Sequence, residues 1–150
     1  MQHAINIAQQ GMSRGQSPFG CAIADPSGRL IVAHNTVVLD TDITAHAEIN
    51  ALREACRVRG DIHLTGCVVA STCEPCPMCM SALHWARVDA VYYGASIADA
   101  TAAGFNELSV PAEEIVRLGN SPVQLTRDIM AEECRRLFSD WLAQPNRSVY

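Results

Sequence analysis

Two short segments restrict the fold of this chain more than any other feature of its sequence. The first is Thr44-Ala45-His46-Ala47-Glu48, and the second, some thirty residues later, is Cys73-Glu74-Pro75-Cys76-Pro77-Met78-Cys79. Imidazole and thiolate groups are metal ligands, and one metal ion shared by both segments would need His46 beside Cys76 and Cys79. The fold must then bring the two segments together at one point.

The residue types and their spacing predict the metal and its role. Cys76 and Cys79 stand at i and i+3, so their sulfurs face one side at the start of a helix. A helix N-terminus also lowers the pKa of a thiol and favours the thiolate that zinc needs. One imidazole and two thiolates suit Zn²⁺, and three protein ligands leave the fourth tetrahedral position for water. Because zinc lowers the pKa of bound water to about 7, we predict a catalytic zinc site.

Glu48 supplies the group that such a site needs for proton transfer. At two residues from His46, it does not share a regular helical face with that ligand. Near the first turn of a helix, however, both side chains can converge on a metal lying ahead of the helix. A carboxylate beside the zinc-bound water can take its proton and pass it to a substrate, so we predict Glu48 as the catalytic acid/base.

Three other interpretations of the cysteines remain open at this point. A redox Cys-x-x-Cys would require neither His46 nor Glu48. A closed structural zinc site would use Cys73 as the fourth ligand, and the protein would then be a zinc-stabilised binding module. The third interpretation is coincidence, with no metal bound.

The remaining composition limits the cellular setting. A length of 150 residues fits one compact domain. No apolar run approaches the roughly 18–20 residues that cross a bilayer, and Met1-Gln2-His3-Ala4 lacks the pattern of a signal peptide. We therefore expect a cytoplasmic protein without membrane contact, whose seven cysteines are reduced. Four of them are expected to be core residues: Cys21, Cys56, Cys67 and Cys134.

The charge of the chain points to a small substrate. The net charge is −5, and the 11 Lys and Arg residues form no run. Binding to nucleic acid depends heavily on clustered basic side chains, so we expect no nucleic-acid partner. A small neutral molecule suits this chain better than a polyanion.

The pattern of apolar residues predicts alternating helices and strands. Helices are predicted over 3–14, from a Thr44 cap to about 59, over 76–87, 97–103, 111–118 and 128–143, and strands over 19–24, 30–38, 67–71, 90–94 and 123–125. This order predicts an α/β fold of three layers, with a mixed central sheet flanked by helices on both faces. Ligands of such folds lie beyond strand ends near helix N-termini, where both metal segments fall.

The two motifs together resemble the zinc signature of the cytidine deaminase superfamily, and the resemblance implies its three-layer fold. Within the superfamily the chain is most similar to bacterial guanine deaminases. The supporting matches are Ser17-Pro18-Phe19-Gly20, Asn35, Trp85-Ala86-Arg87, Ala103-Gly104-Phe105 and the terminal Tyr150. One position departs from the pattern, because this chain has Asn106-Glu107 where close relatives have two acidic residues.

This resemblance implies hydrolysis of guanine to xanthine and ammonia. Glu48 would protonate the ring nitrogen beside the attacked carbon and then the leaving amine, and Glu107 would assist at the amine. The resemblance also implies a set of substrate-binding residues: Phe19, Asn35, Ala47, Trp85 and Tyr150. Asn35 would hydrogen-bond the base, and Phe19 and Trp85 would form apolar and stacking walls.

The resemblance further implies a homodimer in which residues 144–150 cross to the partner subunit and close its site, with Tyr150 near the pocket. Residues 1–150 would form the single deaminase domain. A small nucleobase is the expected substrate. Other small aminoheterocycles, namely cytosine, cytidine, pterins or triazines, remain alternatives. A tRNA adenosine deaminase shares Pro-Cys-Pro-Met-Cys, but it would be expected to have a basic surface.

Overall fold

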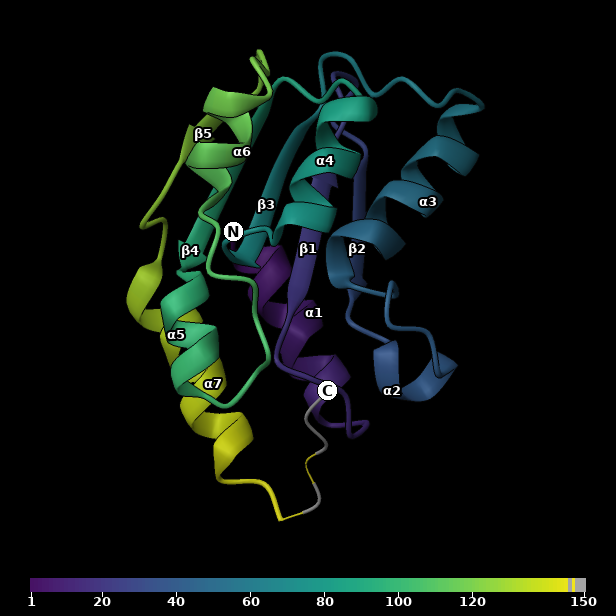
Figure 1. Ribbon diagram of the computed structural model, residues 1–150. Helices are drawn as coiled ribbons and strands as arrows, with labels where there is room; N and C mark the ends of the chain where they lie inside the picture. The colour runs from purple at the N-terminus through teal and green to yellow at the C-terminus, as the bar shows by residue number, and fades with distance from the viewer. Residues whose placement is uncertain (146, 148–150) are drawn as a thin grey trace.

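A mixed sheet of five strands runs through the molecule between two layers of helices (Figure 1). The computed structural model describes residues 1–145 and residue 147. The strands lie in the order β2-β1-β3-β4-β5. Their bounds are β1 Gly20–Ala24, β2 Leu30–His34, β3 Val68–Cys73, β4 Ala90–Ala95 and β5 Gln124–Thr126. The predicted three-layer α/β/α architecture with a mixed sheet is confirmed.

The strand directions bring three strand ends to one edge of the sheet. β1 pairs antiparallel with both β2 and β3, whereas β3, β4 and β5 run parallel. Gly20 at the start of β1 pairs with His34 at the end of β2, and the Gly20 amide donates to Oγ1 of Thr72 near the end of β3, at 3.0 Å. The start of β1 and the ends of β2 and β3 therefore lie together.

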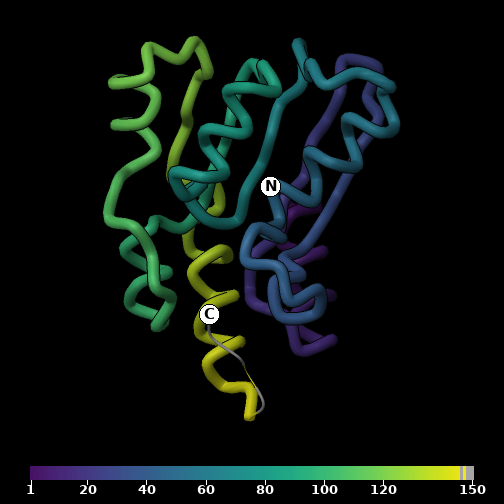
Figure 2. Tube along the Cα trace, turned by 45° about the vertical axis from the view of Figure 1, so that its right-hand side comes forward, coloured from purple at the N-terminus to yellow at the C-terminus, as the bar shows by residue number. Residues whose placement is uncertain are grey.

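Each face of the sheet is covered by its own set of helices. On one face lie α3 (Ala47–Arg59), α4 (Pro77–Trp85) and α6 (Ala112–Leu118), which bury an aliphatic core with strand residues such as Ile23, Val69 and Val91. On the other face lie α1 (Gln2–Met12) and α7 (Ala131–Leu142). Figure 2 shows the sheet between these layers from a second angle. The short helices α2 (Val37–Asp40) and α5 (Ile97–Ala102) complete the fold.

Two strand glycines let α1 and α7 approach the sheet closely. A Cβ atom on Gly20 would lie 2.1 Å from the carbonyl oxygen of Ala4 in α1. A Cβ atom on Gly94 would lie 2.2 Å from the sulfur of Cys134 in α7. Both distances are far below a normal contact, so any side chain at these positions would push the helix away from the sheet.

The second strand is shorter than predicted, because the chain turns after His34. The Oδ1 atom of Asn35 accepts a hydrogen bond from the Val37 amide at 3.1 Å, and the Asp40 amide donates to the carbonyl of Thr36 at 2.8 Å. These bonds start a helical turn, so residues 37–40 form α2 instead of extending the strand. The predicted strand over 30–38 is therefore wrong beyond residue 34.

Two helix starts also differ from the predictions. Thr44 does not cap α3, because its hydroxyl donates to the Asp42 carboxylate at 2.7 Å and His46 occupies the N-cap position. The last helix begins at Ala131 rather than at residue 128, since Met130 has a φ of +53° that breaks the helical path. Ile129 accordingly precedes the helix that it was predicted to join.

The C-terminal helix belongs to the fold of its own chain, and contacts α1 and β4. Most of the predicted tail, including Tyr150, lies outside the described residues. Among the residues that are described, no helix combines the length and the apolar character needed to cross a bilayer.

Replacing Gly94 by alanine is expected to lower the free energy of unfolding by about 1–3 kcal/mol, because the added methyl group overlaps the sulfur of Cys134. Urea unfolding followed by circular dichroism measures the change. The loss should be smaller when the same substitution is made in a Cys134→Ala background, where the sulfur is gone. An unchanged urea midpoint in the single variant would contradict this packing.

Candidate active site

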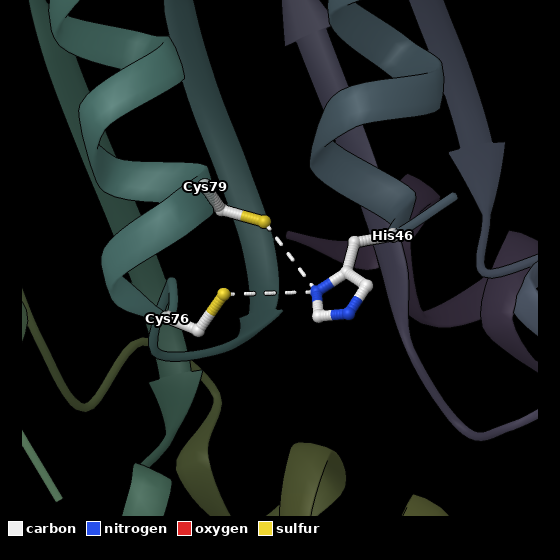
Figure 3. A group of neighbouring side chains, drawn as sticks. All are labelled: His46, Cys76 and Cys79. Carbon is white, nitrogen blue, oxygen red and sulfur yellow. Dashed lines mark hydrogen bonds between the residues drawn. The ribbon is translucent and has the colours of Figure 1, made fainter. Parts of the chain in front are cut away.

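The N-terminal ends of α3 and α4 meet at a cluster of metal-binding groups (Figure 3). His46 is the N-cap residue of α3 and Cys76 is the N-cap residue of α4, while Cys79 lies one turn into α4. The His46 Nδ1 atom lies 3.7 Å from the sulfur of Cys76 and 3.5 Å from that of Cys79. The structure thus brings the three predicted metal ligands together.

The geometry of this cluster fits a zinc ion. All three ligand atoms lie within 4.8 Å of one another. Bonds to a tetrahedral zinc ion, about 2.0–2.1 Å for nitrogen and 2.3 Å for sulfur, place nitrogen and sulfur about 3.5 Å apart. The observed separations of 3.5 and 3.7 Å match that value closely. His46, Cys76 and Cys79 can therefore hold zinc with little movement.

The two cysteines do not titrate alike. Interaction with the neighbouring Cys79 side chain lowers the pKa of Cys76 to about 4, and interaction with Cys76 raises the pKa of Cys79. The lowered pKa of Cys76 favours a thiolate beside the His46 ring, as metal binding requires. Both sulfurs become thiolates when they coordinate zinc.

Glu48 lies next to the metal ligands and is almost completely buried. One carboxylate oxygen accepts a hydrogen bond from the Ser71 hydroxyl at 2.8 Å, and the other accepts from the Cys79 thiol at 3.5 Å. Burial raises the pKa of Glu48, which suits a group that must both take and give a proton. The structure therefore puts the predicted acid/base where it can reach a molecule on the metal.

Ser71 is a residue that the sequence reasoning missed. It lies in β3, is buried, and orients the Glu48 carboxylate through the bond described above. One signal was available, because Ser71 and Thr72 are two polar residues at the end of an otherwise apolar strand. That pattern marks the end of β3 as a place where side chains face a site and not the core.

Cys73, the rival fourth ligand, points elsewhere. Its sulfur donates to the carbonyl oxygen of Ser96, at 3.4 Å. Within the described residues, the metal-binding cluster contains His46, Cys76 and Cys79 without Cys73. This geometry favours the open site with a free coordination position over the closed structural site.

A cavity extends from the cluster, in two parts. The inner part measures about 20 Å³, which is room for roughly one water molecule, and it borders Glu48, His46 and Cys76. The outer part measures about 270 Å³ and borders the same His46 and Cys76. Its other lining residues are mainly apolar: Ile43, Pro77, Met78, Phe105, Asn106, Glu107 and Leu108. A small flat molecule can therefore enter over apolar side chains and reach the metal ligands.

Two of the residues predicted to bind substrate line this cavity, and a third does not. Phe19 and Asn35 line its inner part, from the start of β1 and the end of β2. Asn35 is completely buried. Ala47 is completely buried as well, but it packs into the aliphatic core next to His46 and does not line the described cavity.

Trp85 lies away from the cavity, at the C-terminal end of α4, whereas the metal ligands occupy the N-terminal end. Its side chain is 74% exposed. The structure therefore separates Trp85 from the pocket that it was predicted to wall.

Glu107 reaches the cavity on a loop that follows α5. Gly104 has a φ of +99°, which turns the chain back toward the sheet. Phe105 then packs edge-on against Phe19 at 4.8 Å and lies 4.9 Å from the ring of Trp141. This contact places Glu107 in the wall of both parts of the cavity, beside His46 and Cys76, and burial raises the pKa of Glu107.

Comparison with known proteins agrees with this geometry. A family model described as the cytidine and deoxycytidylate deaminase zinc-binding region matches residues 1–95. The guanine deaminase of Bacillus subtilis is 40% identical over 121 residues, which cover 76% of this chain and 78% of that protein. The tRNA-specific adenosine deaminase of the same organism is 30% identical over 139 residues, covering 93% of this chain and 84% of that protein.

A solved structure shares the fold as well. The guanine deaminase of Nitrosomonas europaea superimposes with a TM-score of 0.87 at 25% sequence identity, covering 95% of this chain and 82% of that chain.

The placement of the sulfurs predicts the zinc content of two matched variants. Cys73→Ser should retain about one zinc ion per chain, because its sulfur lies outside the cluster, whereas Cys79→Ser should lose zinc. Mass-spectrometric metal analysis after dialysis against a weak chelator measures both. Loss of zinc from Cys73→Ser would instead indicate the closed, four-ligand site.

Proposed function

This chain belongs to the cytidine and deoxycytidylate deaminase family of zinc-dependent hydrolytic enzymes, and on that premise we propose that it hydrolyses guanine to xanthine and ammonia. The observation that carries the proposal is the pair of carboxylates, Glu48 and Glu107, in the wall of one small cavity beside the metal ligands. Guanine offers amino and ring N–H donors to such a wall. The similarity to two guanine deaminases supports the same substrate.

The residues divide the reaction between them. His46, Cys76 and Cys79 would hold the zinc ion, which when bound would supply the Lewis acidity that activates water toward the purine carbon bearing the amino group. Glu48 takes a proton from the attacking water and delivers it to the neighbouring ring nitrogen. Glu48 then takes the second proton and gives it to the amine, which leaves as ammonia while the carbon–oxygen double bond of xanthine forms.

Other side chains bind and orient the base. The inner cavity wall supports the proposal that Asn35 hydrogen-bonds the base and that Phe19 packs against its edge. Glu107, on the opposite loop, is proposed to contact the amino group and to assist its protonation. Ser71 holds the Glu48 carboxylate in the orientation that these transfers need.

The negative charge around the pocket favours guanine over tRNA, the main alternative substrate. The similarity to a tRNA-specific adenosine deaminase makes tRNA the second candidate substrate. The inner cavity is bordered by three carboxylates, those of Glu48, Glu74 and Glu107, and the chain carries a net charge of −5. Such a surface repels phosphates, so a free base is favoured over a nucleic acid.

An ammonia-release assay tests the substrate directly. We expect turnover of guanine, with xanthine identified by chromatography, and little turnover of cytosine, cytidine, adenine, pterins, triazines or an anticodon stem-loop of tRNA. If guanine is inert while another of these compounds reacts, the substrate proposal is wrong and the zinc chemistry still stands.

Glu48→Gln is expected to lower kcat about 10²–10⁴-fold, because the amide cannot transfer the proton. The variant should retain its zinc, since Glu48 is not a ligand. Activity close to that of the unaltered protein would contradict the assignment and would favour a binding module with a structural zinc.

We also propose that the protein acts in the cytoplasm as a homodimer in which residues 144–150 of one subunit cover the site of the other. All seven cysteines are free thiols, as expected in a reducing compartment. α7 packs on its own sheet, and the tail follows directly after it, so exchange of the tail alone needs no unfolding of the domain. Such a cover would exclude bulk water and raise the rate at which the bound substrate reacts.

Mixing two inactive variants tests the exchanged tail. A chain lacking residues 144–150 and a full-length Glu48→Gln chain should each show low activity. When they are unfolded and refolded together, the intact tail of the second chain would cover the intact site of the first, and activity should rise above that of either alone. No rise in a mixture that forms two-chain assemblies in analytical ultracentrifugation would show that the tail stays with its own subunit.

A further inference from the structure

Glu74 lies in the turn between β3 and α4, two residues before the zinc ligand Cys76. Its backbone amide donates to the carbonyl of Ala95 at 2.8 Å, which holds the turn against the end of β4. Its carboxylate accepts two further hydrogen bonds, one from the Ile97 amide at 3.1 Å and one from the Ala112 amide at 2.8 Å. A single side chain thereby joins three separate parts of the fold.

The two amides that Glu74 binds stand at the two ends of one segment. Ile97 is the first residue of α5 and Ala112 is the first residue of α6. Amides at helix starts have no partner within their helix, so the carboxylate satisfies groups that would otherwise need another acceptor. Everything between these two positions, including the loop with Glu107, is fixed at both ends to the turn that carries the zinc ligand.

The loop itself contains few backbone bonds that could set its position. The Glu107 amide donates to the carbonyl of Phe105, and the Val110 amide to that of Leu108, each only two residues away. Phe105 packs against Phe19, but this contact precedes Glu107 by two residues. At the far end of the segment, the bond from the Ala112 amide to Glu74 adds a direct link between this loop and the turn that carries Cys76.

We propose that Glu74 is a positioning residue that sets the distance between the Glu107 carboxylate and the zinc ligands, and so acts on deamination through Glu107. The inference rests on the proposed function for its kinetic test. The bridge explains why an acidic side chain stands at position 74, since a bond to each of two amides is best made with two acceptor oxygens. Glutamine offers one acceptor oxygen and would leave one of the two amides without its bond.

A double-mutant cycle with Glu74→Gln and Glu107→Gln tests this coupling. Glu74→Gln alone should lower kcat/KM for guanine about tenfold, a coupling of the size measured for residues that share one network. In a Glu107→Gln background the same substitution should lower kcat/KM less than about twofold. Equal losses in both backgrounds, with full zinc content, would show that Glu74 acts independently of Glu107 and would overturn the proposal.

Asp99→Asn is the matched control. The Asp99 carboxylate also caps α5, since it accepts from the amide and the hydroxyl of Ser96 at 2.8 Å, but these bonds hold only the start of α5 and not Ala112. Its substitution should lower the thermal midpoint and give the same fold-change in both Glu107 backgrounds. If Asp99→Asn shows the coupling that we assign to Glu74, the bridge has no special role.

Hydrogen–deuterium exchange provides a readout that does not depend on the substrate. Peptides covering residues 103–111 should exchange faster in Glu74→Gln than in the unaltered protein, and at unaltered rates in Glu107→Gln. If Glu74→Gln does not fold, Glu74→Asp keeps the charge but is too short to reach both amides, and it should show the same acceleration. Unchanged exchange in the folded variant would overturn the proposal, whereas an unaltered protein without activity toward guanine would overturn only the proposed function.

Discussion

The meeting of two helix N-termini at one edge of the sheet is the constraint on which the rest of this structure depends. His46 and Cys76 are the cap residues of α3 and α4, and both helices lie on the same face of the sheet. Because β1 runs antiparallel between β2 and β3, the start of β1 and the ends of β2 and β3 lie together near those helix starts. The site is thus assembled from five element ends, and the close fit of α1 and α7 at Gly20 and Gly94 holds the opposite face in place.

The buried carboxylate of Glu48 is subject to two opposing influences on its protonation. An isolated buried carboxylate favours its protonated form, and burial here raises the pKa of Glu48. A zinc ion held by the neighbouring ligands would act in the opposite sense, because a cation stabilises the charged form. A group held between these two influences can change its protonation state as charge moves in the substrate. The hydrogen bond from Ser71 fixes the side chain so that the proton moves while the carboxylate stays still.

The motif carried most of what could be predicted from the sequence. The four main site residues fall in two short segments, His46 and Glu48 in one and Cys76 and Cys79 in the other. Within each segment, the spacing of the residues predicts the local geometry. Ser71 and Glu74 escaped prediction because their partners are set by sheet register and by helix packing, as in the bond from the Ala112 amide to Glu74. The errors at 35–38 and at Thr44 have a similar origin. Short polar side chains there bond to neighbouring groups and override the apolar pattern.

Glu107, which we propose contacts the substrate, is held in place differently from the metal ligands and Glu48. The metal ligands and Glu48 lie at the N-terminal ends of α3 and α4, and both helices pack against the aliphatic core. Glu107 lies on a loop whose position depends on Phe105 at one side and on the Glu74 bridge at the other. A change in the loop can therefore alter which base fits while the helices keep the metal site intact. Glu74 limits that freedom, because its carboxylate ties the variable wall of the cavity to the turn that carries Cys76.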